Sequence, residues 1–103
     1  MITLTDAALV ELKRSMKKYG YEDCCYYLKV AITGSGSLGL EYKIQFIQKQ
    51  EYIDNYDNYV EQEQDGLHIV VDKESDLYMN GTIMHWDRDG FVFNNPFTTE
   101  CKL

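Results

Sequence analysis

Two runs of alternating apolar and polar residues, separated by a glycine-rich stretch, constrain the fold of this chain more than any other feature. The runs cover residues 24–32 and 40–48, and a hydrophobic period of two is typical of strands. Between them lie Gly34, Gly36 and Gly39, which match the G-x-G-x-x-G pattern of dinucleotide-binding loops. That pattern holds a pyrophosphate only where the glycine turn opens a helix. Since a second strand-like run follows here, the sequence predicts a β-hairpin, and we expect no nucleotide at its loop.

One amphipathic helix is predicted before the hairpin, over residues 6–19. Thr5 is suited to cap its N-terminus, and Gly20 is suited to end it, because glycine adopts the left-handed conformation that closes a helix. Apolar side chains recur at helical spacing along its expected inner face, at Leu9, Leu12, Met16 and Tyr19. This face should pack on the rest of the molecule.

Short strands separated by turns are predicted for the second half of the chain. We expect an irregular connection over 49–65, strands over 67–71, 82–86 and 91–93, a short helix over 72–78, and turns at Asp65-Gly66, Asn80-Gly81 and Asp89-Gly90. The elements together predict a mainly β fold with α (α+β), a compact sandwich or pseudobarrel with the first helix packed on one side. Its expected buried residues are Leu9, Leu12, Leu28, Val30, Ile44, Phe46, Ile69, Val71, Phe91 and Phe93.

Charge is distributed unevenly along the 103 residues, which predict a single domain over 1–103. The net charge is −7, yet residues 1–20 carry four basic and two acidic side chains, whereas residues 51–103 carry twelve acidic and three basic ones. Such a surface repels phosphate backbones, so we expect no nucleic-acid partner. No apolar run approaches the ~20 residues that span a bilayer, and no signal-peptide core opens the chain, so we expect no membrane partner.

The three cysteines are Cys24, Cys25 and Cys101. An odd number with two adjacent members is a poor disulfide framework, which favours a reducing, cytoplasmic location. Adjacent residues of a strand point to opposite faces, so at most one of Cys24 and Cys25 could face a common site. We expect both to have structural packing roles and Cys101 to be the accessible thiol.

Four stretches, in this order, carry a resemblance over nearly the whole chain: ITLTDAALVELKRSM, YLKVAITGSGSLGLEYKIQF, DGLHIVVDKESDLYMNGT and GFVFNNP. They resemble the A-type iron–sulfur cluster carriers, the HesB-like family. The resemblance implies the HesB-like fold and a role in iron–sulfur cluster assembly rather than an enzyme activity. It also implies protein partners, either as a homodimer or within a larger protein assembly.

The resemblance breaks at the ligand positions, because the family's loop reads Gly-Cys-Ser-Gly and its tail ends in Cys-Gly-Cys. Aligning the loops from Gly36 to Gly39 places Ser37 where the first ligand cysteine belongs. Cys101 is followed only by two further residues, so the second tail cysteine is missing. The spacing from Asn-Pro to Cys101 is also one residue short, and the stretch between Thr82 and Gly90 is shorter than in the family.

Two functional hypotheses follow. In the first, the protein is an atypical A-type carrier that binds an iron–sulfur cluster or iron weakly through Cys101, with Ser37, Gly36 and Gly39 beside it. In the second, the fold carries no cluster and serves as a structural or protein-interaction module, such as a subunit of a larger assembly. The family resemblance favours the first hypothesis and is the reason to place it first. Ligand number favours the second, since a cluster takes about four thiolates and a serine hydroxyl does not ionise near neutral pH.

The residues alone leave two other binding sites to consider. His68 and His85, with Asp72 and Asp87, could ligate a metal, although no closely spaced ligand pair occurs. The run YIDNYDNYVEQEQD could bind calcium or a basic partner. It lacks the acid pattern around a fixed glycine that defines an EF-hand loop, which favours a solvated loop.

Overall fold

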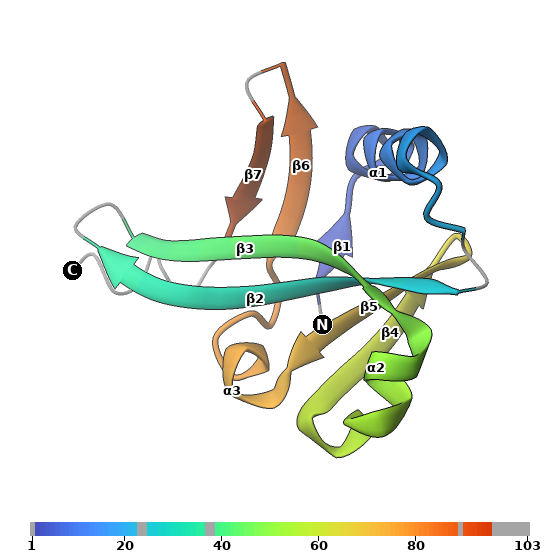
Figure 1. The fold of residues 1–103 in the computed structure, drawn as a ribbon. Helices are drawn as coiled ribbons and strands as arrows, with labels where there is room; N and C mark the ends of the chain where they lie inside the picture. The colour runs from blue at the N-terminus through green and yellow to red at the C-terminus, as the bar shows by residue number, and fades with distance from the viewer. Residues whose placement is uncertain (1, 23–24, 37–38, 89, 96–103) are drawn as a thin grey trace.

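The strands form two sheets with a helix packed across them (Figure 1). The computed structural model describes residues 2–22, 25–36, 39–88 and 90–95. The four-stranded sheet has the order β3-β2-β5-β4, and the three-stranded sheet has the order β1-β6-β7. The elements are β1 (Thr3–Leu4), α1 (Asp6–Tyr19), β2 (Tyr26–Gly36), β3 (Gly39–Gln48), α2 (Lys49–Asp54), the 3-10 turn η1 (Tyr56–Asn58), β4 (Tyr59–Gln64), β5 (Leu67–Asp72), α3 (Lys73–Asp76), β6 (Ile83–Asp87) and β7 (Gly90–Asn94). The predicted α+β class is confirmed.

Helix α1 begins and ends where the sequence predicts. The Thr5 hydroxyl accepts a hydrogen bond from the Ala8 amide, and Gly20 closes the helix with φ of 77°. Tyr19 was expected on the inner face but is 64% exposed. The chain turns back at Gly20, and the next residue, Tyr21, packs instead, with its ring centroid 5.3 Å from that of Phe46. Among the described residues, no helix is both long and apolar enough to cross a membrane.

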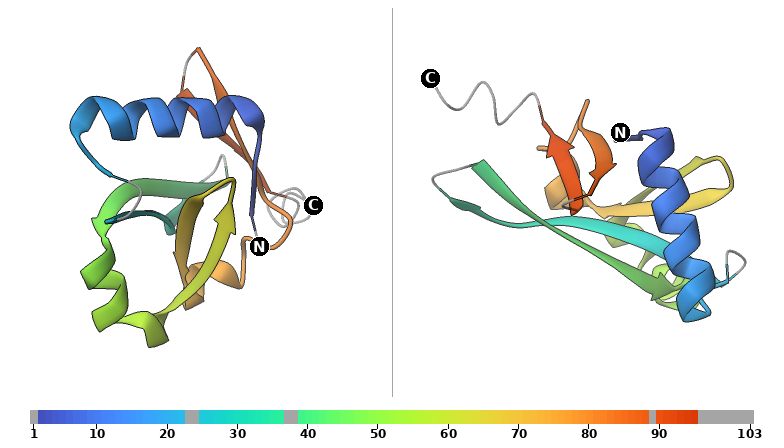
Figure 2. Two further views of the ribbon diagram at one scale, coloured as in Figure 1. Left: turned by 90° about the vertical axis from the view of Figure 1, so that its right-hand side faces the viewer. Right: turned by 90° about the horizontal axis from the view of Figure 1, so that it is seen from above.

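The predicted β-hairpin is confirmed, and it projects as a ribbon from the body of the molecule (Figures 1 and 2). Strands β2 and β3 pair antiparallel from Tyr26–Gln48 to Gly36–Gly39, with a bulge after Ile32. Strand β5 pairs with β2 only as far as Val30. Beyond that residue, the only described strand that pairs with β2 is β3. A two-stranded ribbon is marginally stable by itself, so contacts at its base decide where its tip lies.

The irregular connection expected over residues 49–65 is wrong. This segment forms α2, the η1 turn and strand β4, which pairs with β5 along its whole length. The inward positions of β4 include Gln62 and Gln64, which are half-buried, while Glu61 and Glu63 are exposed. Because glutamines occupy inward positions, the segment lacks an alternation of apolar and polar residues, and the sequence does not predict a strand here.

These two glutamines join the two sheets through strand β1. The Gln62 side-chain oxygen accepts from the Ile2 amide at 3.0 Å, and its Nε2 donates to the Ile2 carbonyl at 2.7 Å. Gln64 makes the same pair of bonds with Leu4, at 3.0 and 2.7 Å. The other edge of β1 bonds to β6. Side-chain amides thus take the place of a neighbouring strand and satisfy backbone groups that would otherwise lack partners.

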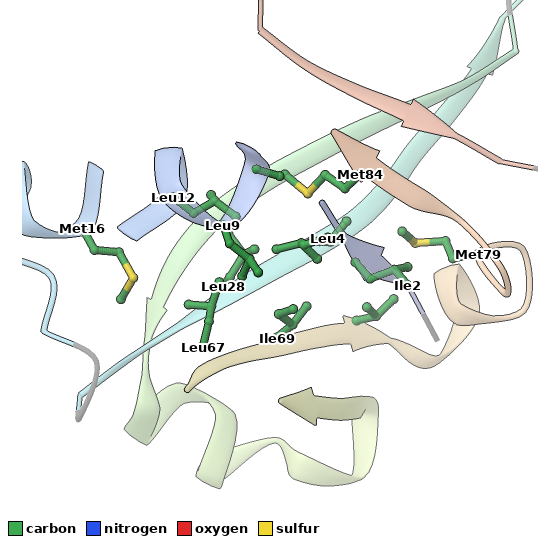
Figure 3. Packing of buried hydrophobic residues seen from close by; sticks show 13 residues of the cluster. Ile2, Leu4, Leu9, Leu12, Met16, Leu28, Leu67, Ile69, Met79 and Met84 are labelled. Atoms are coloured by element: carbon green, nitrogen blue, oxygen red, sulfur yellow. The ribbon is translucent and has the colours of Figure 1, made fainter. Parts of the chain in front are cut away.

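The main core lies where α1 and both sheets meet (Figure 3). Six of the ten expected core residues are buried, namely Leu9, Leu12, Leu28, Val30, Ile69 and Val71. The other four, Ile44, Phe46, Phe91 and Phe93, pack against this cluster but stay half-buried. They lie on β3 and β7, which are edge strands of their sheets. Three of the four line an open groove of about 440 Å³ that α1 also borders.

Candidate functional site

The glycine loop lies at the far end of the β2–β3 ribbon. Gly36 and Gly39 are the last paired residues of the two strands and close the hairpin. Ser37, between them, lies outside the described residues, as does Cys101. Both glycines of the predicted site are therefore at the ribbon tip.

Helix α3 holds the base of the ribbon from one side. The Asp72 carboxylate caps this helix by accepting from the Ser75 amide at 3.2 Å. The buried Ser75 hydroxyl oxygen in turn accepts a hydrogen bond from the Ile32 amide at 2.9 Å. Ile32 is the last residue of β2 before the bulge, and its amide would otherwise lack a ladder partner. Asp72, considered above as a metal ligand, instead has a capping role here.

Phe93 on β7 and Asn95, which directly follows this strand, hold the base of the ribbon from the other side. The rings of Phe93 and Tyr42 stack with centroids 4.2 Å apart and planes 7° apart. Asn95, which is 4% exposed, donates through Nδ2 to the Tyr42 hydroxyl at 2.8 Å and to the Tyr78 carbonyl at 2.7 Å. We call the three residues Tyr42, Tyr78 and Asn95 the Asn95 clamp. Nothing in the sequence pattern alone pairs these residues, which come from three separate segments.

The two histidines do not share a site. His68, on β5, lies with Nδ1 2.7 Å from a Glu61 carboxylate oxygen and stacks on the Tyr27 ring. His85, on β6 of the other sheet, has Nδ1 2.9 Å from the Thr5 hydroxyl. Within the described parts of the chain, no group of three or more histidine, cysteine, aspartate or glutamate side chains could hold a metal ion. The histidine interpretation therefore has no geometric support.

Cys25 is exposed, so it does not pack in the core. It immediately precedes β2, and its carbonyl accepts from the Lys49 amide at 2.8 Å. The backbone is thus held at the start of α2 while the side chain borders a shallow surface pocket. Cys24 lies outside the described residues.

A second polar cluster lies on the outer face of the four-stranded sheet. The two carboxylate oxygens of Glu61 contact the His68 ring and, at 3.3 Å, the Tyr52 hydroxyl. Tyr27 lies between them, with ring centroids 4.7 Å from His68 and 5.3 Å from Tyr52. Desolvation first, and then the negative charge of Glu61, raises the pKa of both Tyr27 and Tyr52. No pattern in the sequence predicts this cluster, because its members come from four separate elements.

We expect Tyr27 and Tyr52 to ionise late, and their ionisation to weaken the fold in alkali. The pKa of each tyrosine is raised in the folded state above the ordinary value of 10.0. Their contribution to the free energy of unfolding is therefore complete below about pH 10 and is lost as the pH rises through the folded pKa. Absorbance at 295 nm should show Tyr27 and Tyr52 ionising after the other tyrosines, and Glu61→Gln should bring their ionisation to lower pH. If Tyr27→Phe and Tyr52→Phe remove only the early part of the absorbance change, the assignment is wrong.

The arrangement of two sheets, an N-terminal helix and a glycine-tipped ribbon is the fold of the A-type iron–sulfur cluster assembly proteins. A crystal structure of IscA with a [2Fe-2S] cluster superposes with a TM-score of 0.69 at 20% identity, covering 93% of this chain and 86% of that one. A solution structure of an Aquifex aeolicus protein gives 0.69 at 26% identity, covering 92% and 91%.

Sequence comparison gives the same result. The family profile described as "Iron-sulphur cluster biosynthesis" matches residues 1–101. SufA of Bacillus subtilis is 32% identical, covering 92% of this chain and 77% of that protein. The iron-binding protein IscA of Serratia proteamaculans is 28% identical, covering 97% and 91%. The chain therefore belongs to the iron–sulphur cluster biosynthesis family, and it is an A-type cluster assembly protein. The comparisons support the carrier hypothesis and not the structural-module alternative.

Proposed function

We propose that this protein carries an iron–sulfur cluster or iron as cargo and holds it weakly, through Cys101 beside the Gly36–Gly39 loop. The observation that carries the proposal is the family match over residues 1–101, which includes the ribbon and reaches Cys101. Two relatives support the choice of cargo: the IscA structure contains a [2Fe-2S] cluster, and the Serratia protein is named for iron binding.

Weak binding follows from the number of thiolates. Iron–sulfur clusters are held by about four cysteine thiolates, and in this proposal each chain contributes Cys101, while Ser37 stands at the position of the loop cysteine. Two chains related by a twofold axis would supply two Cys101 thiolates. The serine hydroxyls cannot make up the difference near neutral pH. A cluster shared in this way is under-ligated, so it exchanges readily with a partner protein.

Chain length allows Cys101 to reach the loop. Asn95 is fixed against Tyr42, and Tyr42 lies three positions along β3 from Gly39. At about 3.4 Å a residue, the loop is roughly 10 Å from that anchor. Six residues from Asn95 to Cys101 span at most about 21 Å when fully extended. The thiol can therefore approach the loop of its own chain or that of a second copy.

In this proposal the protein acts by binding and release rather than by catalysing a reaction. Its partners are proteins, as a homodimer or as the donor and acceptor of the cargo. A reducing compartment such as the cytoplasm suits the proposal, because Cys101 must remain a thiol to ligate iron.

Anaerobic reconstitution with iron and sulfide tests the proposal. We expect the wild type to take up a substoichiometric cluster that chelators remove quickly, and Cys101→Ala to lose most of it, because the loop supplies no thiolate. Visible absorbance and iron content per chain are the measurements. Cys25→Ala is the matched control, since it removes an exposed cysteine that lies away from the loop in sequence and should leave uptake unchanged.

Two outcomes would contradict the proposal. A stable, near-stoichiometric cluster that survives Cys101→Ala would show that other residues are the ligands. A wild type that binds no iron at all would favour a cluster-free module.

A further inference from the structure

We propose that the free edge of β3, with the groove beside it, is a docking site for an extended segment of a partner protein in which apolar residues alternate with acidic ones. The segment pairs with β3 as a further strand of the four-stranded sheet. This inference goes beyond the proposed function, because it uses none of the proposed ligands and does not depend on the cargo.

The first step concerns the edge of β3. This strand ends the order β3-β2-β5-β4, and among the described strands only β2 pairs with it. An edge strand offers unpaired backbone N–H and C=O groups, which proteins usually protect with proline, inward charges, a short strand or a covering segment. Strand β3 has ten residues and no proline, whereas the edge strands β4 and β7 have six and five residues. Its inward side chains Tyr42, Ile44 and Phe46 carry no charge, so the edge lacks the usual protection against strand addition.

The second step concerns the apolar groove of about 440 Å³ beside this edge. Its lining includes Ile44 and Phe46 of β3, Phe91 of β7, and Tyr19 and Tyr21 at the end of α1. The rings of Tyr19, Tyr21 and Phe46 form a row, with centroid separations of 6.4 and 5.3 Å. Tyr19 ends the row and is exposed. Alternate residues of an added strand point to the same face as Ile44 and Phe46, so its apolar side chains enter the groove and cover this row.

The third step concerns charge, which favours an acidic segment. Lys43 is exposed on the face of β3 opposite the groove, where Glu41 is its neighbour on the same face. At the rim of the groove, Lys18 lies with Nζ 5.5 Å from the centroid of a ring that lines it. Arg14, one helical turn earlier, is exposed and pairs with Glu11. The site thus carries three basic and two acidic groups in a chain of net charge −7, and opposite charges on neighbouring strands stabilise their pairing.

Peptide binding to the metal-free protein tests the proposal. The probe is a short fluorescein-labelled peptide in which phenylalanine and valine alternate with aspartate and glutamate, and fluorescence anisotropy gives its dissociation constant. Two further versions carry backbone N-methyl groups, one at the odd amides and the other at the even amides. Only one of these sets faces β3 in a paired strand. One version should therefore bind like the parent, and the other should lose about tenfold or more in affinity, because its donors to β3 are removed.

Two pairs of protein variants locate the site. Lys43→Glu places a like charge beside the acidic strand, and Tyr19→Ser removes the exposed end of the aromatic row, so each should weaken binding about fivefold. The matched controls are Lys73→Glu on α3, directly after β5, and Tyr56→Ser in η1, directly before β4 at the opposite edge of the sheet. Both controls replace exposed residues and should leave the dissociation constant within twofold. Hydrogen exchange should show that the peptide protects the amides of β3.

Several results would overturn the proposal. They are the absence of saturable binding, equal affinities of the two N-methylated versions, protection of β4 or β7 amides instead of those of β3, and controls that weaken binding as much as Lys43→Glu and Tyr19→Ser. Protection of the β3 amides that rises with protein concentration without peptide would show that a second copy occupies the edge, and it would also overturn the proposal. Because the measurement uses no iron, its failure is distinguishable from failure of the proposed cargo binding.

Discussion

Replacing Ser37 by cysteine should markedly increase cluster retention, and it is the largest functional effect that we expect from a single substitution. The change adds one thiolate per chain, which raises the supply of a dimer from two to four, the number that an iron–sulfur cluster takes. After anaerobic reconstitution, iron and sulfide per chain should rise, and loss of visible absorbance to a chelator should slow, because more of the cluster's ligand positions are filled by thiolates.

Thr33→Cys is the control for this gain, because it adds a thiol to the same ribbon at an exposed position before the loop. It should give no increase. Equal gains in Ser37→Cys and Thr33→Cys would show that any added thiol recruits iron and that the loop is not the site. No gain from Ser37→Cys would show that Cys101 and the loop do not form a common site.

Removal of the two inward glutamines should produce the largest loss of stability. Gln62→Ala with Gln64→Ala deletes four hydrogen bonds to Ile2 and Leu4 and leaves backbone groups of β1 without partners. At about 1 kcal/mol for each bond, and more where a buried group is left unsatisfied, the double variant should lose about 3–5 kcal/mol. That is a large share of the ~5–15 kcal/mol that stabilises a domain.

Urea unfolding followed by the fluorescence of the single tryptophan, Trp86, measures this loss. Trp86 lies on β6, the strand that pairs with β1, so it reports on the sheet that the glutamines support. Glu63→Ala, at the exposed position between them on β4, is the control and should change stability by less than about 0.5 kcal/mol. A double variant that loses less than about 1 kcal/mol would mean that water replaces the glutamine amides without cost.

The sequence by itself determined the local elements with strong periodic or turn signals. Helix α1 lies between Thr5, whose hydroxyl can cap a helix, and Gly20, whose backbone can adopt the left-handed conformation that ends one. The hairpin follows from the alternation of apolar and polar residues on both sides of the glycines. The order of family-like stretches also indicated membership of the A-type assembly proteins, and Ser37 at the position of the loop cysteine led to the prediction of weak cluster binding.

The tertiary structure decided whatever depends on contacts between distant segments. Strand β4 was invisible in the sequence because Gln62 and Gln64 face inward, and a polar residue is buried only where distant backbone groups satisfy it. Tyr19 has helical spacing like Met16, but its exposure was decided by where the chain turns after Gly20. Asn95 reads as an ordinary polar loop residue. Only the fold brings Tyr42 and Tyr78 to its amide, because hydrogen bonds between residues far apart in the chain leave no period in the sequence.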